Sequence, residues 1–321
     1  MDNSPTSQVL APKDLPGMNE FLLVFHFERP AAIPENPVAL LRGLLGRALA
    51  HRFHPALPPA APEEAIPVDS PYWALFKPRS GGRDEGRPPY LLECAWGAGH
   101  AVSLHVRLRT FGGSAAHARI YAEALETYPR LALGEFGERI SCLLEWMRLP
   151  APVWPVWPGE EAAPRPLALE FTSPAQLSVK LDPPLTKTSL DALLFDPVPG
   201  HAAVAGRPAD PLPLLVQAAA LSAARALEGF GARLPGPGGP ALSRCLRDAA
   251  HDRTRFFRAA LRRHENPADR AARRQPAEGV MGHLEMLADP LLAWHLECGA
   301  LLGVGGRISH GCGRIALHPL H

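Results

Sequence analysis

Lysine is scarce in this chain, although basic residues as a whole are not. Of 33 basic residues only Lys13, Lys77, Lys180 and Lys187 are lysines, and the formal net charge is +1. This near-neutral balance does not by itself indicate a polyanionic partner. Arginine, however, forms bidentate contacts with phosphate and stacks on bases. Where the arginines lie in the sequence therefore says more than their total.

Long apolar runs, a secretory signal and paired cysteines are also missing. No apolar run is long enough to span a membrane, and residues 1–16 lack the basic start and apolar core of a signal peptide. The five cysteines are odd in number, and no pair of them has the spacing of metal ligands. We therefore expect a cytoplasmic protein with no membrane partner, no metal and no cofactor.

The first half of the chain alternates strand-like and helix-like segments. Short apolar and aromatic runs predict strands at 20–28, 90–96, 101–112 and 138–149. Helical spacing of apolar residues predicts helices at 37–53 and 115–128. Asn36 is the expected cap of the first helix, with Pro37 at its first position. The resulting order is that of the split βαβ unit of ferredoxin-like and RNA-recognition-type domains.

A proline-rich stretch then separates this half from a second one with a similar alternation. In the second half, strands are predicted at 167–180, 279–288 and 314–320. Helices are predicted at 214–231 and 290–303, and also from Arg253 to Arg263. We expect an N-terminal domain over 1–150, a stiff linker over 151–165 and a C-terminal domain over 166–321. The expected fold class is α+β, with two tandem ferredoxin-like domains.

The segment from Arg244 to Arg274 concentrates positive charge. It contains ten arginines and four acidic residues. On the predicted helix, steps of three, four and five residues place several of the candidates for binding a nucleic-acid backbone on one side. These candidates are Arg255, Arg258, Arg262 and Arg263. The same pattern is equally typical of a solvated helix face.

Five glycines fall close together near the C-terminus, in "GVGGRISHGCG" from Gly303 to Gly313. The run is not a P-loop, since no Gly-Lys-Ser/Thr follows, and it is not a dinucleotide fingerprint, since Ile308 replaces the third glycine. Two structures fit it. The backbone amides could form a nest that faces phosphates, or the glycines could allow a tight turn with close helix–strand packing.

This pattern of Gly-apolar-Gly, five residues with a basic one among them, and Gly-apolar-Gly resembles the glycine-rich loop of CRISPR-associated endoribonucleases that process repeat RNA. These proteins belong to the repeat-associated mysterious protein (RAMP) superfamily. The segments "GVMGHLEM" and "LLRGLLGRAL" are also similar to the family's Gly-containing strand and first helix. The resemblance implies two tandem ferredoxin-like domains, which agrees with the order of elements found above.

The resemblance further implies that the protein binds CRISPR repeat RNA and cleaves precursor crRNA by attack of a 2′-hydroxyl, without a metal. Histidine is suited to proton transfer near neutral pH. Gly43, Arg47, His51 and His54 step by four, four and three residues, so they share one helix face. We therefore expect His51 or His54, assisted by Arg47, to be catalytic.

Further residues are expected to contact the RNA through the first helix and the glycine-rich loop. They are Arg42, Gly305, Arg307, His310 and Gly311. The shortage of lysine near the histidines leaves an alternative open, because arginine is a poor proton donor. In that alternative the protein is a non-cleaving crRNA-binding subunit that joins other subunits of a CRISPR effector complex. An α+β scaffold whose glycines only make a turn is a third interpretation.

Overall fold

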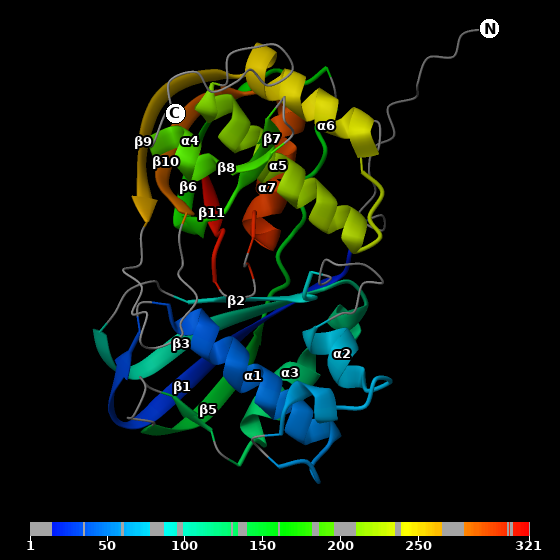
Figure 1. Cartoon of the computed structure of the whole chain (residues 1–321), viewed down its shortest axis with the longest axis vertical. Coiled ribbons are helices and arrows are strands. Elements are labelled where there is room, and N and C mark those ends of the chain that lie inside the picture. The colour runs from blue at the N-terminus through cyan, green and yellow to red at the C-terminus, as the bar shows by residue number, and fades with distance from the viewer. Residues whose placement is uncertain are drawn as a thin grey trace, which may run out of the picture. The chain divides into compact units, whose positions relative to one another are not determined.

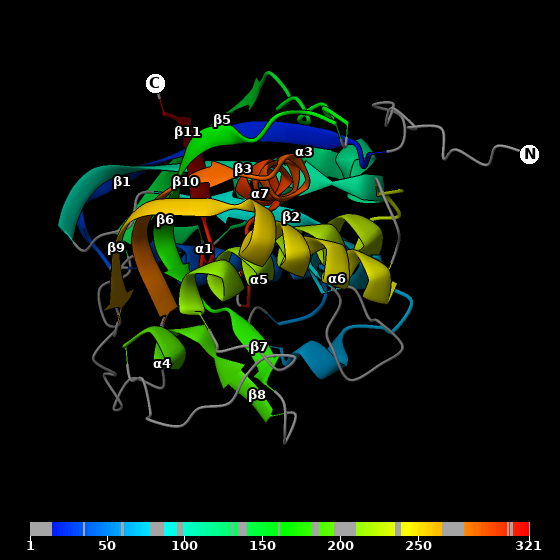
Figure 2. The same ribbon diagram turned by 90° about the horizontal axis from the view of Figure 1, so that it is seen from above.

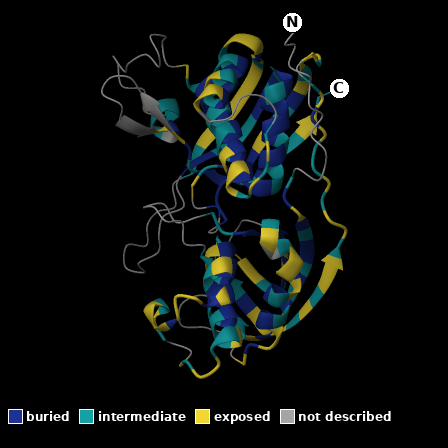
Figure 3. Cartoon of the chain, turned by 90° about the vertical axis from the view of Figure 1, so that its right-hand side faces the viewer, coloured by how far each residue is buried: buried dark blue, intermediate teal, exposed yellow. Residues whose placement is uncertain are grey.

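The computed structural model describes most of the chain and divides it into two compact units. The described residues are 15–34, 36–58, 61–77, 87–94, 99–129, 131–133, 140–159, 161–181, 186–195, 210–234, 239–264, 279–306, 308 and 311–320. The N-terminal unit joins 16–153 to the short segment 309–311, and the C-terminal unit takes most of 154–308 together with 312–321. In each unit the buried residues line the inner sides of the helices and of the sheet (Figure 3).

The N-terminal unit is an antiparallel sheet with helices packed on it (Figure 1). Its strands are β1 (Met18–Ile33), β2 (Tyr90–Glu93), β3 (Gly99–Phe111), β4 (Ala132–Leu133) and β5 (Ile140–Leu149), in the order β2-β3-β1-β5-β4. Its helices are α1 (Pro37–Phe53), α2 (Pro71–Phe76) and α3 (Ala118–Glu126), with 3₁₀ turns η2 (Glu63–Ala65) and η3 (Gly112–His117). The predicted order of the main strands and helices is confirmed.

Alternation along β1 explains how this sheet holds its core. Phe21, Leu23 and Phe25 are almost fully buried and join the core formed with α1 and α3. The side chains between them lie on the opposite face, as the period of two requires. Pro37 occupies the first turn of α1 as expected, but the side chain of Asn36 makes no capping hydrogen bond.

The C-terminal unit has a second antiparallel sheet, with the order β11-β6-β10-β9. Its strands are β6 (Arg165–Ala175), β9 (Arg255–His264), β10 (Gly279–Ala288) and β11 (Ile315–Pro319), beside a hairpin of β7 (Ser178–Leu181) and β8 (Thr186–Ser189). Its helices are α4 (Leu190–Phe195), α5 (Pro211–Gly229), α6 (Gly239–Asp248) and α7 (Pro290–Leu302), with a π-helical turn η4 (Ala249–Arg253). Helix α5 lies beside both α6 and α7 (Figure 2). No helix among the described residues is long and apolar enough to span a membrane.

The helix expected from Arg253 to Arg263 is wrong, because this segment forms strand β9. Arginine, alanine and leucine favour helices when a segment stands alone. Pairing with β10 overrides that preference, since Phe256 and Leu261 pack against the core from this strand. With β9 as a strand, the C-terminal unit contains the same main strand order as the N-terminal unit.

Part of the expected linker is packed rather than exposed. Trp157 is 8% exposed, and its ring meets that of Trp294 on α7 edge-on, with centroids 6.0 Å apart. Trp294 Nε1 donates a hydrogen bond to the Pro155 carbonyl at 2.9 Å. Residues 155–157 are therefore fixed against the core of the C-terminal unit.

A histidine is buried in the middle of α7. His295 is fully buried, and its Nδ1 lies 2.8 Å from the Leu291 carbonyl, to which it donates as the neutral tautomer. Burial lowers the pKa of His295 to about 4. The ring is therefore neutral in the folded protein at ordinary pH, as expected for a structural histidine.

This burial predicts how stability depends on pH. In the unfolded chain the pKa of His295 returns to about 6.5. Below that pH the unfolded state therefore binds a proton that the folded state does not bind. The free energy of unfolding of the C-terminal unit should be constant above about pH 7 and fall by up to about 3 kcal/mol between pH 6.5 and 4. His295→Asn, which keeps a donor for Leu291, should remove this part of the pH dependence in urea unfolding. Equal pH slopes in both proteins would contradict the assignment.

Candidate nucleic-acid interface

One face of α1 carries an arginine that has no partner among the described residues. Ala39, Gly43, Arg47 and Ala50 are spaced by four, four and three residues and are exposed or half-buried, so they form one face of the helix. Arg47 makes no hydrogen bond, ion pair or ring contact with any residue that the structure describes. By contrast, Arg52 at the end of the same helix is paired with Glu123 at 2.8 Å. Arg47 is thus available to an anion from outside the chain.

The two candidate histidines lie at the C-terminal end of α1 and are held differently. The ring of His51 meets that of Tyr128 edge-on, with centroids 5.8 Å apart. His54 is the C-cap of α1, and its Nε2 lies 2.6 Å from Ser70 Oγ. Ser70 Oγ already accepts the Tyr72 N–H as the N-cap of α2, so its own proton can be donated to a neutral His54. Both histidines are half-buried, and each keeps a ring nitrogen able to exchange a proton with a ligand.

Ser70 was not predicted as a partner of His54. The pair Ser70-Pro71 is a typical helix-start signal and could have located the cap. Its approach to a histidine sixteen residues earlier in the chain depends on how α2 folds back against α1.

Arg42 lies in an aromatic cluster instead of on the Arg47 face. Its guanidinium lies over the ring of Phe76, 5.0 Å from the centroid. Burial raises the pKa of Tyr90 well above its usual value, while the nearby charge of Arg42 opposes that rise. Arg42 therefore has an internal role, and its expected contact with RNA stays a prediction.

The arginines of β9 are divided between the two faces of the C-terminal sheet. Arg258 pairs with Glu285 and Arg262 with Met281 across β10, on the face opposite the core. A bulge at Phe257 brings Arg255 to that same face, since it shifts the register by one residue. These three exposed arginines are called the arginine row below.

Arg263, in contrast, points to the other side of the sheet. Its guanidinium lies over the ring of Phe195 on α4, 5.6 Å from the centroid. Several of the four arginines therefore share one side, but Arg263 does not, because a strand alternates its side chains between the two faces of the sheet. Within the arginine row, only Arg258 has a described acidic neighbour, Glu285 Oε1 at 3.9 Å.

The described amides of the glycine-rich run are used inside the protein. Gly305 N–H donates to Ser222 Oγ at 2.7 Å, and Gly306 N–H donates to the Gln176 carbonyl at 2.9 Å. Val304 N–H donates to the Gly313 carbonyl at 2.8 Å, and Gly313 N–H donates to the Pro174 carbonyl at 2.8 Å. Of the two structures that fit the sequence, these residues do not form the nest of amides that faces phosphates. They provide close helix–strand packing instead.

Glycine is sterically required at Gly313. Its φ is +74°, and a Cβ added there would overlap the Val304 carbonyl oxygen. Gly311 makes a similar approach within the N-terminal unit, where an added Cβ would lie 2.7 Å from Val38 Cβ at the start of α1. The expected RNA contacts Arg307 and His310 lie outside the described residues.

Gly311 lies beside the N-terminal end of α1, whereas His51 and His54 lie at its C-terminal end. Val38, next to Gly311, and His51 are thirteen residues apart in the helix, which corresponds to about 20 Å along its axis. A single phosphate cannot contact both Gly311 and His51. Any RNA that touches both must follow the helix.

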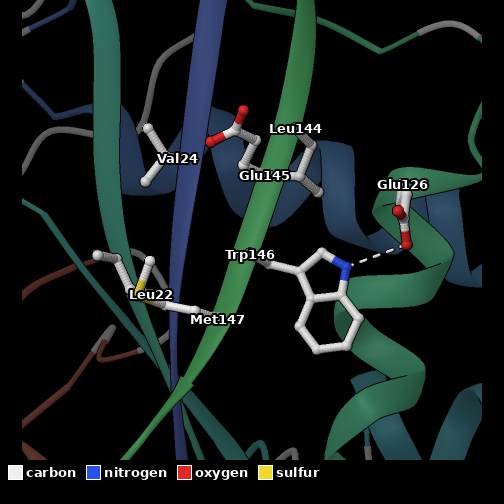
Figure 4. A pocket seen from close by; sticks show the side chains of 7 residues that line it. All are labelled: Leu22, Val24, Glu126, Leu144, Glu145, Trp146 and Met147. Carbon is white, nitrogen blue, oxygen red and sulfur yellow. Dashed lines mark hydrogen bonds between the residues drawn. The ribbon is translucent and has the colours of Figure 1, made fainter.

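A hollow of about 470 Å³ lies elsewhere, on strands β1 and β5 and beside the end of α3 (Figure 4). It is lined by Leu22, Val24, Glu126, Leu144, Glu145, Trp146 and Met147. Trp146 Nε1 donates to Glu126 Oε2 at 3.0 Å. With two carboxylates and no cation in its lining, the hollow is unsuited to a phosphate backbone. The described ranges also contain no group of three His, Cys, Asp or Glu residues that could hold a metal.

Comparison with known proteins identifies the fold. No family model and no curated protein matches the sequence. A Thermus thermophilus Cas6 in a product complex matches with a TM-score of 0.54 at 19% identity, over 94% of this chain and 100% of that chain. A chain of a partial Cas6-RT-Cas1–Cas2 complex matches with a TM-score of 0.51 at 10% identity, over 95% of this chain and 46% of that chain. The chain therefore matches the structure of Cas6 pre-crRNA processing endoribonucleases, and the resemblance found in the sequence is confirmed for the fold.

The packing role of Gly313 can be tested by substitution. We expect Gly313→Ala to destabilise the C-terminal unit by more than about 2 kcal/mol, because a Cβ cannot fit beside the Val304 carbonyl. Gly306→Ala is the matched control in the same run, since its Cβ would have only ordinary contacts, at 3.6 Å or more. Urea unfolding measures both. Equal stabilities would show that the close approach does not exist.

Proposed function

We propose that this protein is an endoribonuclease that binds CRISPR repeat RNA and cleaves precursor crRNA without a metal. The observation that carries this proposal is the match of the whole chain to a Cas6 structure, over 94% of this chain and 100% of that one. The order β2-β3-β1-β5 in one unit and β11-β6-β10-β9 in the other supports two ferredoxin-like domains, joined by residues 151–165.

The proposed reaction uses the RNA's own 2′-hydroxyl. That oxygen attacks the adjacent phosphorus in line, and the bond to the 5′-oxygen breaks, which leaves a 2′,3′-cyclic phosphate and a 5′-hydroxyl. One proton leaves the 2′-hydroxyl, and one must reach the departing 5′-oxygen. His51 or His54 supplies one of these transfers, and the guanidinium of Arg47, which has no described partner, stabilises the charge that develops on the phosphate.

The arginine row is the proposed binding surface for the rest of the repeat RNA. Its side chains project from one strand, and strand residues are spaced about 3.3 Å apart, so the row follows an extended backbone rather than one phosphate. Phosphate contacts of this kind provide affinity without reading the bases.

A non-cleaving crRNA-binding subunit is the second candidate function. It is favoured by the arginine composition of α1, which contains no lysine. The only lysine described in the N-terminal unit, Lys77, is paired with Glu63 at 2.9 Å. In this candidate the partners include other subunits of a CRISPR complex, as in the assembly that the second matched structure represents.

Cleavage in the presence of chelator separates these two functions. We expect the protein to cut its own repeat RNA in EDTA, and His51→Ala or His54→Ala to slow the cut by about 10²–10⁴-fold while changing affinity little. His117→Ala, an exposed histidine of η3, is the matched control and should behave as wild type. Tight binding without any product would favour the non-cleaving subunit. Full activity in the His51 and His54 double variant would exclude this end of α1 as the catalytic site.

The arginine row is tested by the salt dependence of binding. Replacing Arg255, Arg258 and Arg262 with alanine should lower the slope of log affinity against log salt by about two to three, since each phosphate contact contributes about 0.7–0.9. Arg225→Ala, an exposed arginine on α5, is the control and should leave the slope unchanged. An unchanged slope in the triple variant would remove β9 from the RNA-binding surface.

A further inference from the structure

Gly43 stands in the middle of α1 without a steric reason inside the described chain. A Cβ added at Gly43 would come no closer than 3.7 Å to any described atom outside the helix backbone, and that atom is Arg47 Nη1. Its φ is in the ordinary range, since it is not among the glycines with positive φ. Glycine is among the weakest helix formers, and alanine would fit here.

Gly46, one turn further along α1, is a glycine that packing within the protein does require. A Cβ at Gly46 would lie 2.6 Å from Phe76 Cζ, so glycine is needed there for α2 to pack on α1. Gly43 has no such neighbour. The described residues therefore give no packing reason for a glycine here, whereas a ligand that approaches this face of α1 would give one.

The surroundings of Gly43 indicate the chemistry of that ligand. Side chains on a helix lean toward its N-terminus, which carries the guanidinium of Arg47 back over the Gly43 backbone. Helix α1 contains no acidic residue, and Arg47 is half-buried without a described partner. A glycine backbone beside a cation without a described partner fits a ligand group that combines an anion with an adjoining uncharged part.

We propose that Gly43 is a binding residue for RNA: its bare backbone receives the ribose next to the phosphate that Arg47 holds. This inference rests on the proposed function and extends it, because Gly43 has no part in proton transfer. Gly43 lies one turn of helix from Arg47 and two turns from His51, or about 12 Å along the axis. It therefore positions the nucleotide on the side of the reacting phosphate away from the histidines.

Replacing Gly43 with alanine should raise the stability of the protein and weaken its binding of RNA. We expect Gly43→Ala to raise the melting temperature by about 1–3 °C, because alanine favours the helix. At the same time the added methyl group should weaken binding of a fluorescein-labelled repeat RNA by about tenfold or more. Gly46→Ala is the matched control, and it should lower the melting temperature.

The double variant Gly43→Ala/Arg47→Ala tests whether the two residues hold the same nucleotide. Its loss of affinity should be smaller than the product of the two single losses, since neighbours on one ligand are not additive. A lower melting temperature for Gly43→Ala, or affinity equal to wild type, would overturn this inference while the arginine row still binds RNA. If the wild-type protein binds neither repeat RNA nor a mixed-sequence RNA, the proposed function fails, and this inference fails with it.

Discussion

The C-terminal unit depends on one close approach between two backbone segments. Val304 follows the end of α7, and Gly313 precedes the start of β11. The Val304 N–H donates a hydrogen bond to the Gly313 carbonyl at 2.8 Å, and there is no space for a Cβ at Gly313. The same run is tied to β6 through Pro174 and Gln176 and to α5 through Ser222. These bonds fix where α7 ends and where the last strand begins. The described glycines of this run therefore serve packing within the C-terminal unit.

Because those amides are already bonded, the RNA binding that we propose has to come from side chains on other surfaces. Two surfaces carry arginines that have no described partner. On α1, Arg47 lies over bare backbone and leads toward the two histidines. On β9, Arg255 and Arg262 project from the face opposite the core. Other arginines have internal roles, such as Arg42 over Phe76 and Arg109 with Glu20. The arginines that we propose to bind RNA therefore differ from the structural arginines in having no described partner or only a distant one.

Much of the fold could be predicted from the sequence, whereas the geometry of the candidate site could not. The strands and helices of the N-terminal unit follow from local periodicity, as in the alternating Phe21, Leu23 and Phe25. The failure at β9 has a physical cause, since its arginines and alanines favour a helix and only pairing with β10 makes the segment a strand. The bulge at Phe257 and the contact of His54 with Ser70 depend on tertiary structure, so no local pattern could have indicated them.

Hydrogen exchange measured by mass spectrometry, with and without repeat RNA, tests most directly whether the glycine-rich run works by packing. The account predicts that amides of residues 303–306 and 313–314 exchange slowly in the free protein and do not change when RNA binds. Protection should appear instead in α1 and β9. Fast exchange at 303–306 in the free protein, followed by strong protection on RNA binding, would contradict the account and return the role of phosphate binding to the glycine amides.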